Sequence, residues 1–155
     1  MVLTNKNLAE RVKTILGLDL GEKRVGAAIS HSGILAQSID TIEYKSEKEL
    51  LIKLNNLIQK NKIELMVIGL PISFSRIKNQ QVKKIEKIIK KIKHVINIPI
   101  ILEDETLTSK IAKDNLSHQK KKKQDIDAES ARIILQSYLD KSEAQISKSE
   151  TNSNV

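Results

Sequence analysis

Cysteine is absent from the chain, which excludes disulfide bonds and metal sites built on thiolates. Aromatic residues make up only 2% of the 155 residues, so the core has to be built from Ile, Leu and Val. No apolar run approaches the roughly 20 residues that a membrane-spanning helix needs. Residues 1–13 lack the apolar segment of a signal peptide. These absences predict a cytoplasmic protein.

Positive charge is in excess, because 27 Lys and Arg oppose 19 Asp and Glu and give a net charge of +8. An excess of this sign favours a polyanionic partner such as nucleic acid. The chain is also rich in Lys, Ile and Asn, as expected from a genome rich in A and T. The charge alone therefore does not decide between nucleic-acid binding and solubility.

Hydrophobic periodicity predicts an α/β fold. Short apolar runs bounded by turn residues predict strands at 13–20, 25–30, 37–44, 65–70 and 98–102. Helical spacing predicts one helix capped by Ser46, with Glu49 as its capping-box partner, and further helices at 82–96, 106–117 and 127–139. Three antiparallel strands that lead into a β-α-β-α-β-α order predict a five-stranded mixed sheet with helices on both faces.

The length suits one domain with a sizeable core. We assign residues 1–12 to a flexible arm, 13–140 to the folded domain and 141–155 to a disordered tail. The tail assignment depends on its composition, which is Ser, Asn, Glu and Lys with almost nothing to bury. In open α/β sheets, sites form outside the carboxyl ends of the strands, so the residues that end each predicted strand are the first to consider.

Acidic residues occupy those strand ends. Asp19 ends the first predicted strand, and Asp104 and Glu105 end the last. Asp127 begins the final helix on the same stripe as Ala131, so its carboxylate should face the sheet. If the first and last strands both lie near the sheet centre, these carboxylates meet.

Crowded carboxylates repel one another, and a hard divalent cation relieves that repulsion. Mg²⁺ or Mn²⁺, as one ion or a pair, would suit oxygen ligands and phosphodiester hydrolysis. Each acid also has a structural explanation, as a turn residue, a complement to a helix dipole or a helix cap. Because all of these acids fall on one edge of the predicted sheet, we favour a metal site over the separate structural explanations.

Basic residues flank this edge on both sides. Lys23 and Arg24 lie in the turn after the first strand, and Lys121 and Lys122 lie in a lysine-rich loop before the final helix. All four are candidate phosphate contacts, and solvated surface charge explains them equally well.

Glycines follow Asp19 in the spacing Asp19-x-Gly21-x-x-x-x-Gly26. This spacing fits the phosphate-binding turn of the actin, Hsp70 and sugar-kinase group, in which glycine lets the backbone approach phosphate. It fits a tight hairpin equally well. Those kinases need two large domains of this kind, and the length holds only one.

Four motifs resemble, in order, those of the YqgF family, also called RuvX. They are LDLGEKRVGAAIS at 18–30, VIGLP at 67–71, DETLTS at 104–109 and DAESARIILQSYL at 127–139. The resemblance implies an RNase H-like fold related to Holliday-junction resolvases. It also implies a nuclease that trims the ends of precursor 16S ribosomal RNA.

The same resemblance implies that Asp19, Asp104, Glu105 and Asp127 are the catalytic acids, with Asp19, Glu105 and Asp127 as metal ligands and Asp104 the alternative to Glu105. Two positions depart from the family pattern. Thr106 replaces the usual Arg, and residues 73–76 replace an Asn-x-Asp-Gly loop.

We therefore expect Mg²⁺- or Mn²⁺-assisted hydrolysis of phosphodiester bonds in precursor 16S ribosomal RNA by a monomer or weak homodimer. One alternative is a resolvase-like endonuclease that uses the same acids on structured DNA. A second is a non-catalytic ribosome-assembly or transcription factor that binds RNA. A third is nucleotide binding through the glycine turn.

Overall fold

The computed structural model describes residues 14–71, 79–105, 114–115, 118 and 122–152. Predictions for the arm 1–12, the loop 73–76, Thr106, Lys121 and nearly all of the helix 106–117 fall outside these residues. The elements run in the order β1 (Ile15–Leu20), β2 (Arg24–Ser30), β3 (Gln37–Glu43), α2 (Glu47–Asn61), β4 (Leu65–Pro71), α3 (Gln80–Val95), β5 (Ile100–Glu105) and α5 (Lys123–Asn152).

The sheet has five strands in the order β3-β2-β1-β4-β5. Pairing is antiparallel from β3 to β1 and parallel from β1 through β4 to β5, which confirms the predicted mixed sheet. β1 lies at the centre, but β5 lies at an edge with β4 between them. The condition that both strands lie near the centre is therefore not met.

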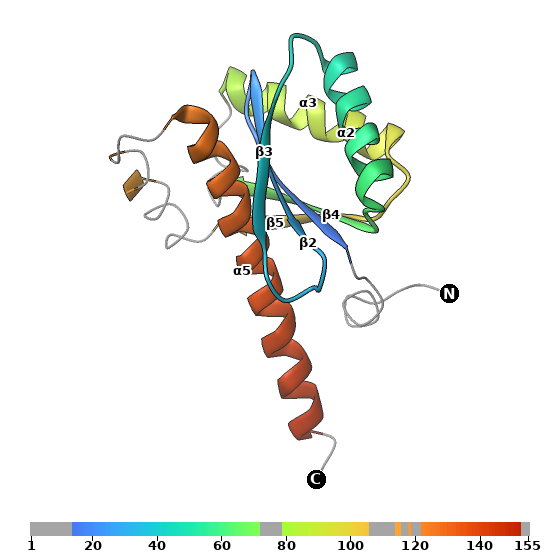
Figure 1. Cartoon of the computed structure of the whole chain (residues 1–155), viewed down its shortest axis with the longest axis vertical. Coiled ribbons are helices and arrows are strands. Elements are labelled where there is room, and N and C mark those ends of the chain that lie inside the picture. Colours follow the sequence, from blue (N-terminus) through green and yellow to red (C-terminus); the bar gives the residue numbers. More distant parts are fainter. Residues whose placement is uncertain (1–13, 72–78, 106–113, 116–117, 119–121, 153–155) are drawn as a thin grey trace.

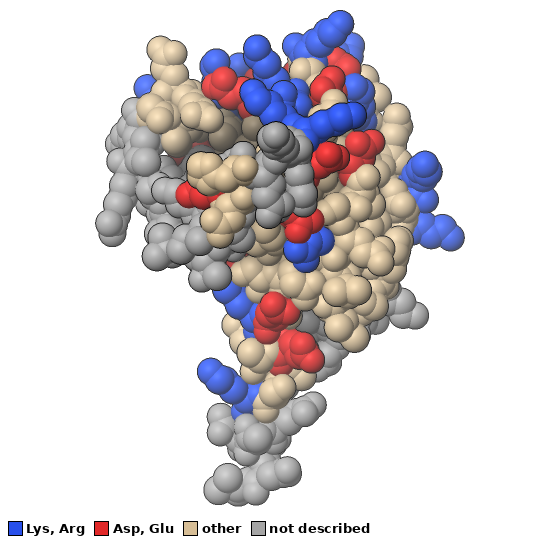
Figure 2. Space-filling view, turned by 60° about the vertical axis from the view of Figure 1, so that its left-hand side comes forward, with Lys and Arg blue, Asp and Glu red and all other residues tan. Residues whose placement is uncertain are grey.

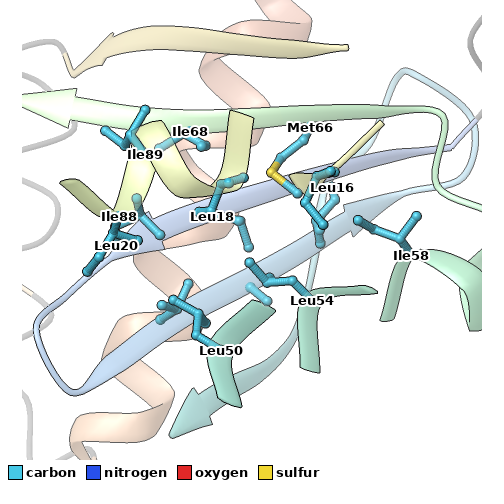
Figure 3. Close-up of a cluster of buried hydrophobic side chains, with 14 of the residues drawn as sticks. Leu16, Leu18, Leu20, Leu50, Leu54, Ile58, Met66, Ile68, Ile88 and Ile89 are labelled. Carbon is cyan, nitrogen blue, oxygen red and sulfur yellow. The ribbon is translucent and has the colours of Figure 1, made fainter. Parts of the chain in front are cut away.

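Helices cover both faces, with α2 and α3 on one face and α5 on the other (Figure 1). Strand alternation sends Leu16, Leu18 and Leu20 into the aliphatic core beneath α2 and α3 (Figure 3). The intervening residues of β1 face α5, where Gly17 lies directly against Leu135. Asp19, two residues further along β1, shares this second face.

The start of α2 matches its prediction. Ser46 is the N-cap, and its hydroxyl accepts the Glu49 N–H at 3.2 Å. The Glu49 carboxylate in turn accepts the N–H of Lys45, one residue before the cap. The helix ends at Asn61, and the C-cap residue Lys62 has a left-handed φ of 53°.

The final helix is longer than predicted at both ends. It begins at Lys123, so Asp127 lies in its second turn and is not its first residue. It continues to Asn152, which corrects the expectation of a helix ending at 139 and of disorder across 141–152. This extension has neither Gly nor Pro, and the hydroxyls of Ser142 and Ser147 bond to carbonyls one turn back. Low apolar content was the wrong criterion, because this extension continues a helix that its packing on the sheet has already nucleated, and adding further residues to an existing helix costs little.

The predicted apolar stripe of α5 faces the sheet. Ala131, Ile134, Leu135 and Tyr138 are all buried there. Glycine on the strands allows this close contact, since a Cβ built at Gly26 would overlap the carbonyl oxygen of Asp127. None of the helices in the described part of the chain combines the length and apolarity that crossing a membrane requires.

Replacing Gly26 by Ala is expected to lower the free energy of unfolding by about 1–3 kcal/mol, a typical cost of overpacking. The added methyl meets helix backbone, which cannot rotate away. Gly69→Ala is the matched control, because its Cβ meets the terminal methyl of Ile134, a flexible side chain. Urea unfolding of both variants checks this, and equal losses would contradict it.

Candidate active site

Asp19 and Asp127 are brought together by strand register and helix packing. Asp19 pairs directly with Gly26 across the β1–β2 ladder. Gly26 lies against the backbone of Asp127, so α5 crosses the sheet beside Asp19. Both acidic side chains are half-buried. Asp19 and Asp127 therefore both lie on the α5 face of the sheet, beside Gly26.

Two hydrogen bonds from β3 fix the first turns of α5. The Thr41 hydroxyl donates to the Gln124 carbonyl at 2.6 Å, and the Ser38 hydroxyl donates to the Glu129 carboxylate at 3.1 Å. Asp127 lies between these two anchors in sequence. Its height above the sheet is thus set by β3 as well as by Gly26.

Arg24 binds Asp127 directly. Its Nε donates to Oδ2 at 3.0 Å, with 35% of the Arg24 side chain and 29% of the Asp127 side chain exposed. A pair this exposed adds at most about 1 kcal/mol to stability. Its larger effect is local, because it places a cation beside two neighbouring acidic residues.

The β1–β2 turn that carries Arg24 is braced from β3. The Gly21 N–H donates to the Arg24 carbonyl at 2.9 Å, and the Tyr44 hydroxyl donates to the Gly21 carbonyl at 2.5 Å. Burial raises the pKa of Tyr44, and the charges of Glu22 and Glu47 raise it further. The phenol is therefore a neutral donor at ordinary pH. Tyr44 was not among the predicted site residues, although it is one of only two tyrosines in the chain.

These contacts favour the hairpin explanation of the glycine spacing. Gly21 lies in the tight turn, where a Cβ would approach the Arg24 carbonyl oxygen to 2.5 Å. Gly26 lies inside β2, and the space above it is filled by α5. Because helix backbone occupies that space, a phosphate cannot approach the strand at Gly26.

The acids of β5 divide between the two faces. Glu103 pairs in register with Gly69 and forms an ion pair with Lys141 of α5, so it lies on the face of Asp19. Asp104 is exposed and pairs in register with Leu70, which belongs to the opposite core. Asp104 is therefore not brought to Asp19 and Asp127. The side chain of Glu105 lies outside the described part of the chain.

The other candidate contacts lie around the hairpin and the start of α5. Lys23 is exposed at the turn, and Lys23 and Arg24 both line a surface hollow of about 730 Å³ that extends to Tyr44. Lys122 is exposed immediately before α5, and its carbonyl accepts the N–H groups of Asp125 and Ile126 in the first turn of the helix. Within the described ranges, no three His, Cys, Asp or Glu side chains form a group that could hold a metal ion.

The chain matches a known protein family over most of its length. The model of the family described as "RuvX: Holliday junction resolvase" matches residues 13–141. Proteins of Crocosphaera subtropica and Clostridium kluyveri, both named "Putative pre-16S rRNA nuclease", are 37% and 41% identical to the chain. These matches cover 88% and 82% of the chain, and 99% and 96% of the relatives.

Solved structures of low sequence identity share the fold. RuvC of Thermus thermophilus, in complex with a Holliday junction substrate, superposes with a TM-score of 0.55 at 12% identity, over 81% of this chain and 93% of that one. The Fowlpox virus resolvase, in complex with Holliday junction DNA, gives 0.51 at 14% identity, over 83% and 97%. The sheet and its helices are thus RNase H-like, and the chain belongs to the RuvX family.

Proposed function

We propose that the chain is a divalent-metal-dependent nuclease that hydrolyses phosphodiester bonds in precursor 16S ribosomal RNA. The observation that carries this proposal is the convergence of Asp19 and Asp127 on one face of the sheet, beside the cationic turn of Arg24. The names of the relatives supply the substrate. The cytoplasmic location and the monomeric or weakly dimeric state remain predictions from the sequence.

The chemistry of the donors suits Mg²⁺ or Mn²⁺. Both cations prefer oxygen ligands, and Mg²⁺ is commonly held by one or two carboxylates together with substrate phosphates. Asp19 and Asp127 provide those carboxylates, and the cysteine-free chain provides no thiolate ligand. The bound ion would supply Lewis-acid activation of the phosphodiester.

The remaining chemistry belongs to the chain itself. Arg24 and Lys23 lie on a turn braced by Tyr44, so they can hold a phosphate group in a fixed orientation. Arg24 now neutralises Asp127, and it has to release that carboxylate before Oδ2 can serve as a ligand. The guanidinium set free in this way can contact the substrate phosphate.

Glu105 is the better candidate for the third acid. Asp104 lies on the face of Leu70, beyond the sheet from Asp19. Alternate positions of a strand share a face, which favours positions 103 and 105 over 104. Glu103 already forms an ion pair with Lys141.

Cleavage of four-way DNA junctions is the second candidate function, and the description of the matching family favours it. The same carboxylates would act on either substrate. Parallel assays with Mn²⁺, on a four-way junction and on a precursor ribosomal RNA fragment, separate the two. Faster cleavage of the junction at equal concentration would replace the proposed substrate.

Asp19→Asn is expected to reduce cleavage of precursor RNA by more than about 100-fold, since even residues behind metal ligands commonly cost 10–100-fold. The assay measures single-turnover rates with Mn²⁺, and calorimetry measures Mn²⁺ affinity in parallel. Asp40→Asn is the control, because Asp40 is exposed on β3. Full activity in Asp19→Asn would overturn the proposal.

The two acids at the end of β5 are expected to behave differently. Glu105→Gln should lose Mn²⁺ affinity and cleavage, while Asp104→Asn should keep both within about twofold, since it lies on the opposite face. The same titrations measure both variants. The reverse result would assign the third ligand to Asp104 and require a rearranged end of β5.

A further inference from the structure

Helix α3 is far more basic than its packing requires. Its 16 residues include six lysines and a single glutamate. All six lysines are exposed, and the helix is anchored to the core by Ile88, Ile89 and Ile92. Hydrophobic periodicity predicted the apolar side of this helix, but it gave no indication of the basic side.

Five of these lysines form one stripe. At 100° per residue they fall within about 120° of the helix surface, roughly opposite the buried isoleucines. We call this set the lysine stripe; its members are Lys83, Lys84, Lys87, Lys90 and Lys91. From first to last they span about 12 Å along the axis.

The lysine stripe opposes the stability of its own helix. The first turn contains no acidic residue, although acids there would complement the helix dipole. Lys83 and Lys87, like Lys87 and Lys91, are like charges four residues apart, which destabilises a helix. A polyanion bound along the stripe would remove this repulsion.

The stripe is continuous with the candidate active site. Lys84 lies 3.4 Å from Glu22, which precedes Lys23 and Arg24 in the β1–β2 turn. Figure 2 shows Lys and Arg side chains gathered at the end of the molecule where α3 lies in Figure 1. The positive surface thus runs from the turn beside Asp127 onto the outer side of α3.

The ion pairs that the lysine stripe makes with acidic residues are weak enough for a phosphate to replace the carboxylate. Lys87 and Lys91 both pair with Glu47, and 66% and 46% of their side chains are exposed. Exposed pairs of this kind contribute about 0–1 kcal/mol, so a phosphate can replace a carboxylate at little cost.

We propose that the lysine stripe is the docking surface for the phosphate backbone of the nucleic-acid strand that enters the site. The proposal rests on the nuclease function proposed above. Phosphates in one strand of a B-form duplex repeat about every 3.4 Å along the axis, so the stripe spans about three or four phosphates of such a strand. A phosphate contact carries no base information, so RNA and DNA should both bind it.

The test compares two triple variants that remove equal charge. Lys83, Lys87 and Lys90 are replaced by Gln in the first. In the control, Lys60, Lys62 and Lys148 are replaced by Gln, since these lie near the other end of the sheet or on the far end of α5. The probe is a fluorescent RNA hairpin with a single-stranded extension, titrated in EDTA at several salt concentrations so that it is not cleaved.

The stripe variant should bind this RNA at least about tenfold more weakly, and the slope of log K against log salt should fall by about two. The control variant should keep the wild-type slope. Equal losses in the two variants would show a non-specific effect of net charge and overturn the proposal. So would unchanged RNA binding with lost binding to phosphatidylserine vesicles, which would assign the stripe to a membrane surface. Circular dichroism of the stripe variant should show α3 intact, since like-charge pairs have been removed.

Kinetics with Mn²⁺ separate this proposal from the nuclease proposal. The stripe variant should raise KM about tenfold and leave kcat unchanged, whereas Asp19→Asn should lower the rate and keep RNA binding. A fall in kcat in the stripe variant would contradict a docking role. Absence of cleavage in the wild type would contradict the nuclease, while the EDTA titration would still decide the docking surface.

Discussion

The contact between the α5 backbone and Gly26 is the constraint on which the site depends. β2 allows the helix this close because no side chain intervenes, and the ladder places Asp19 opposite that same glycine. The hydrogen bond from Thr41 to Gln124 then fixes the first turn of the helix over β3. One small residue in a central region of the sheet thus determines how closely two acids approach, although neither acid is its neighbour in sequence.

Charge balance is the second constraint, because two half-buried carboxylates at one place repel each other. The guanidinium of Arg24 offsets this negative charge by pairing with Asp127. Arg24 is positioned by a turn that the hydrogen bond between Tyr44 and Gly21 holds in place. This compensation comes from a side chain that can move, unlike a buried ion pair, which would be costly to break. The proposed site would therefore be stable without a cation and could still receive one.

Patterns of residues close in sequence predicted most of the strands and helices. They did not predict which distant elements lie next to one another. The strand patterns, the Ser46 cap and the inward stripe of Asp127 depend on residues within a few turns of each other, so periodicity finds them. The edge position of β5 depends on pairing between distant strands, and it separates Asp104 from Asp19. The extension of α5 beyond Leu139 was missed for another reason, since it continues a helix nucleated by packing on the sheet and carries no hydrophobic pattern of its own. Arg24 was predicted to contact substrate, but its ion pair with Asp127 was not predicted, because the two residues are 103 positions apart in the sequence.

The division of charge between the two faces follows from competition for the same carboxylates. Lysines close to Asp19 and Asp127 would pair with them and oppose a divalent cation at that position. The α5 face of the described part of the chain brings one arginine to this pair, and that arginine is bound by Asp127. The lysines of α3 lie behind the sheet, where Glu22 and Glu47 meet them instead. If both proposals hold, a nucleic-acid strand that crosses the carboxyl edge of the sheet would be bound by lysines on one face and cleaved at the acids on the other.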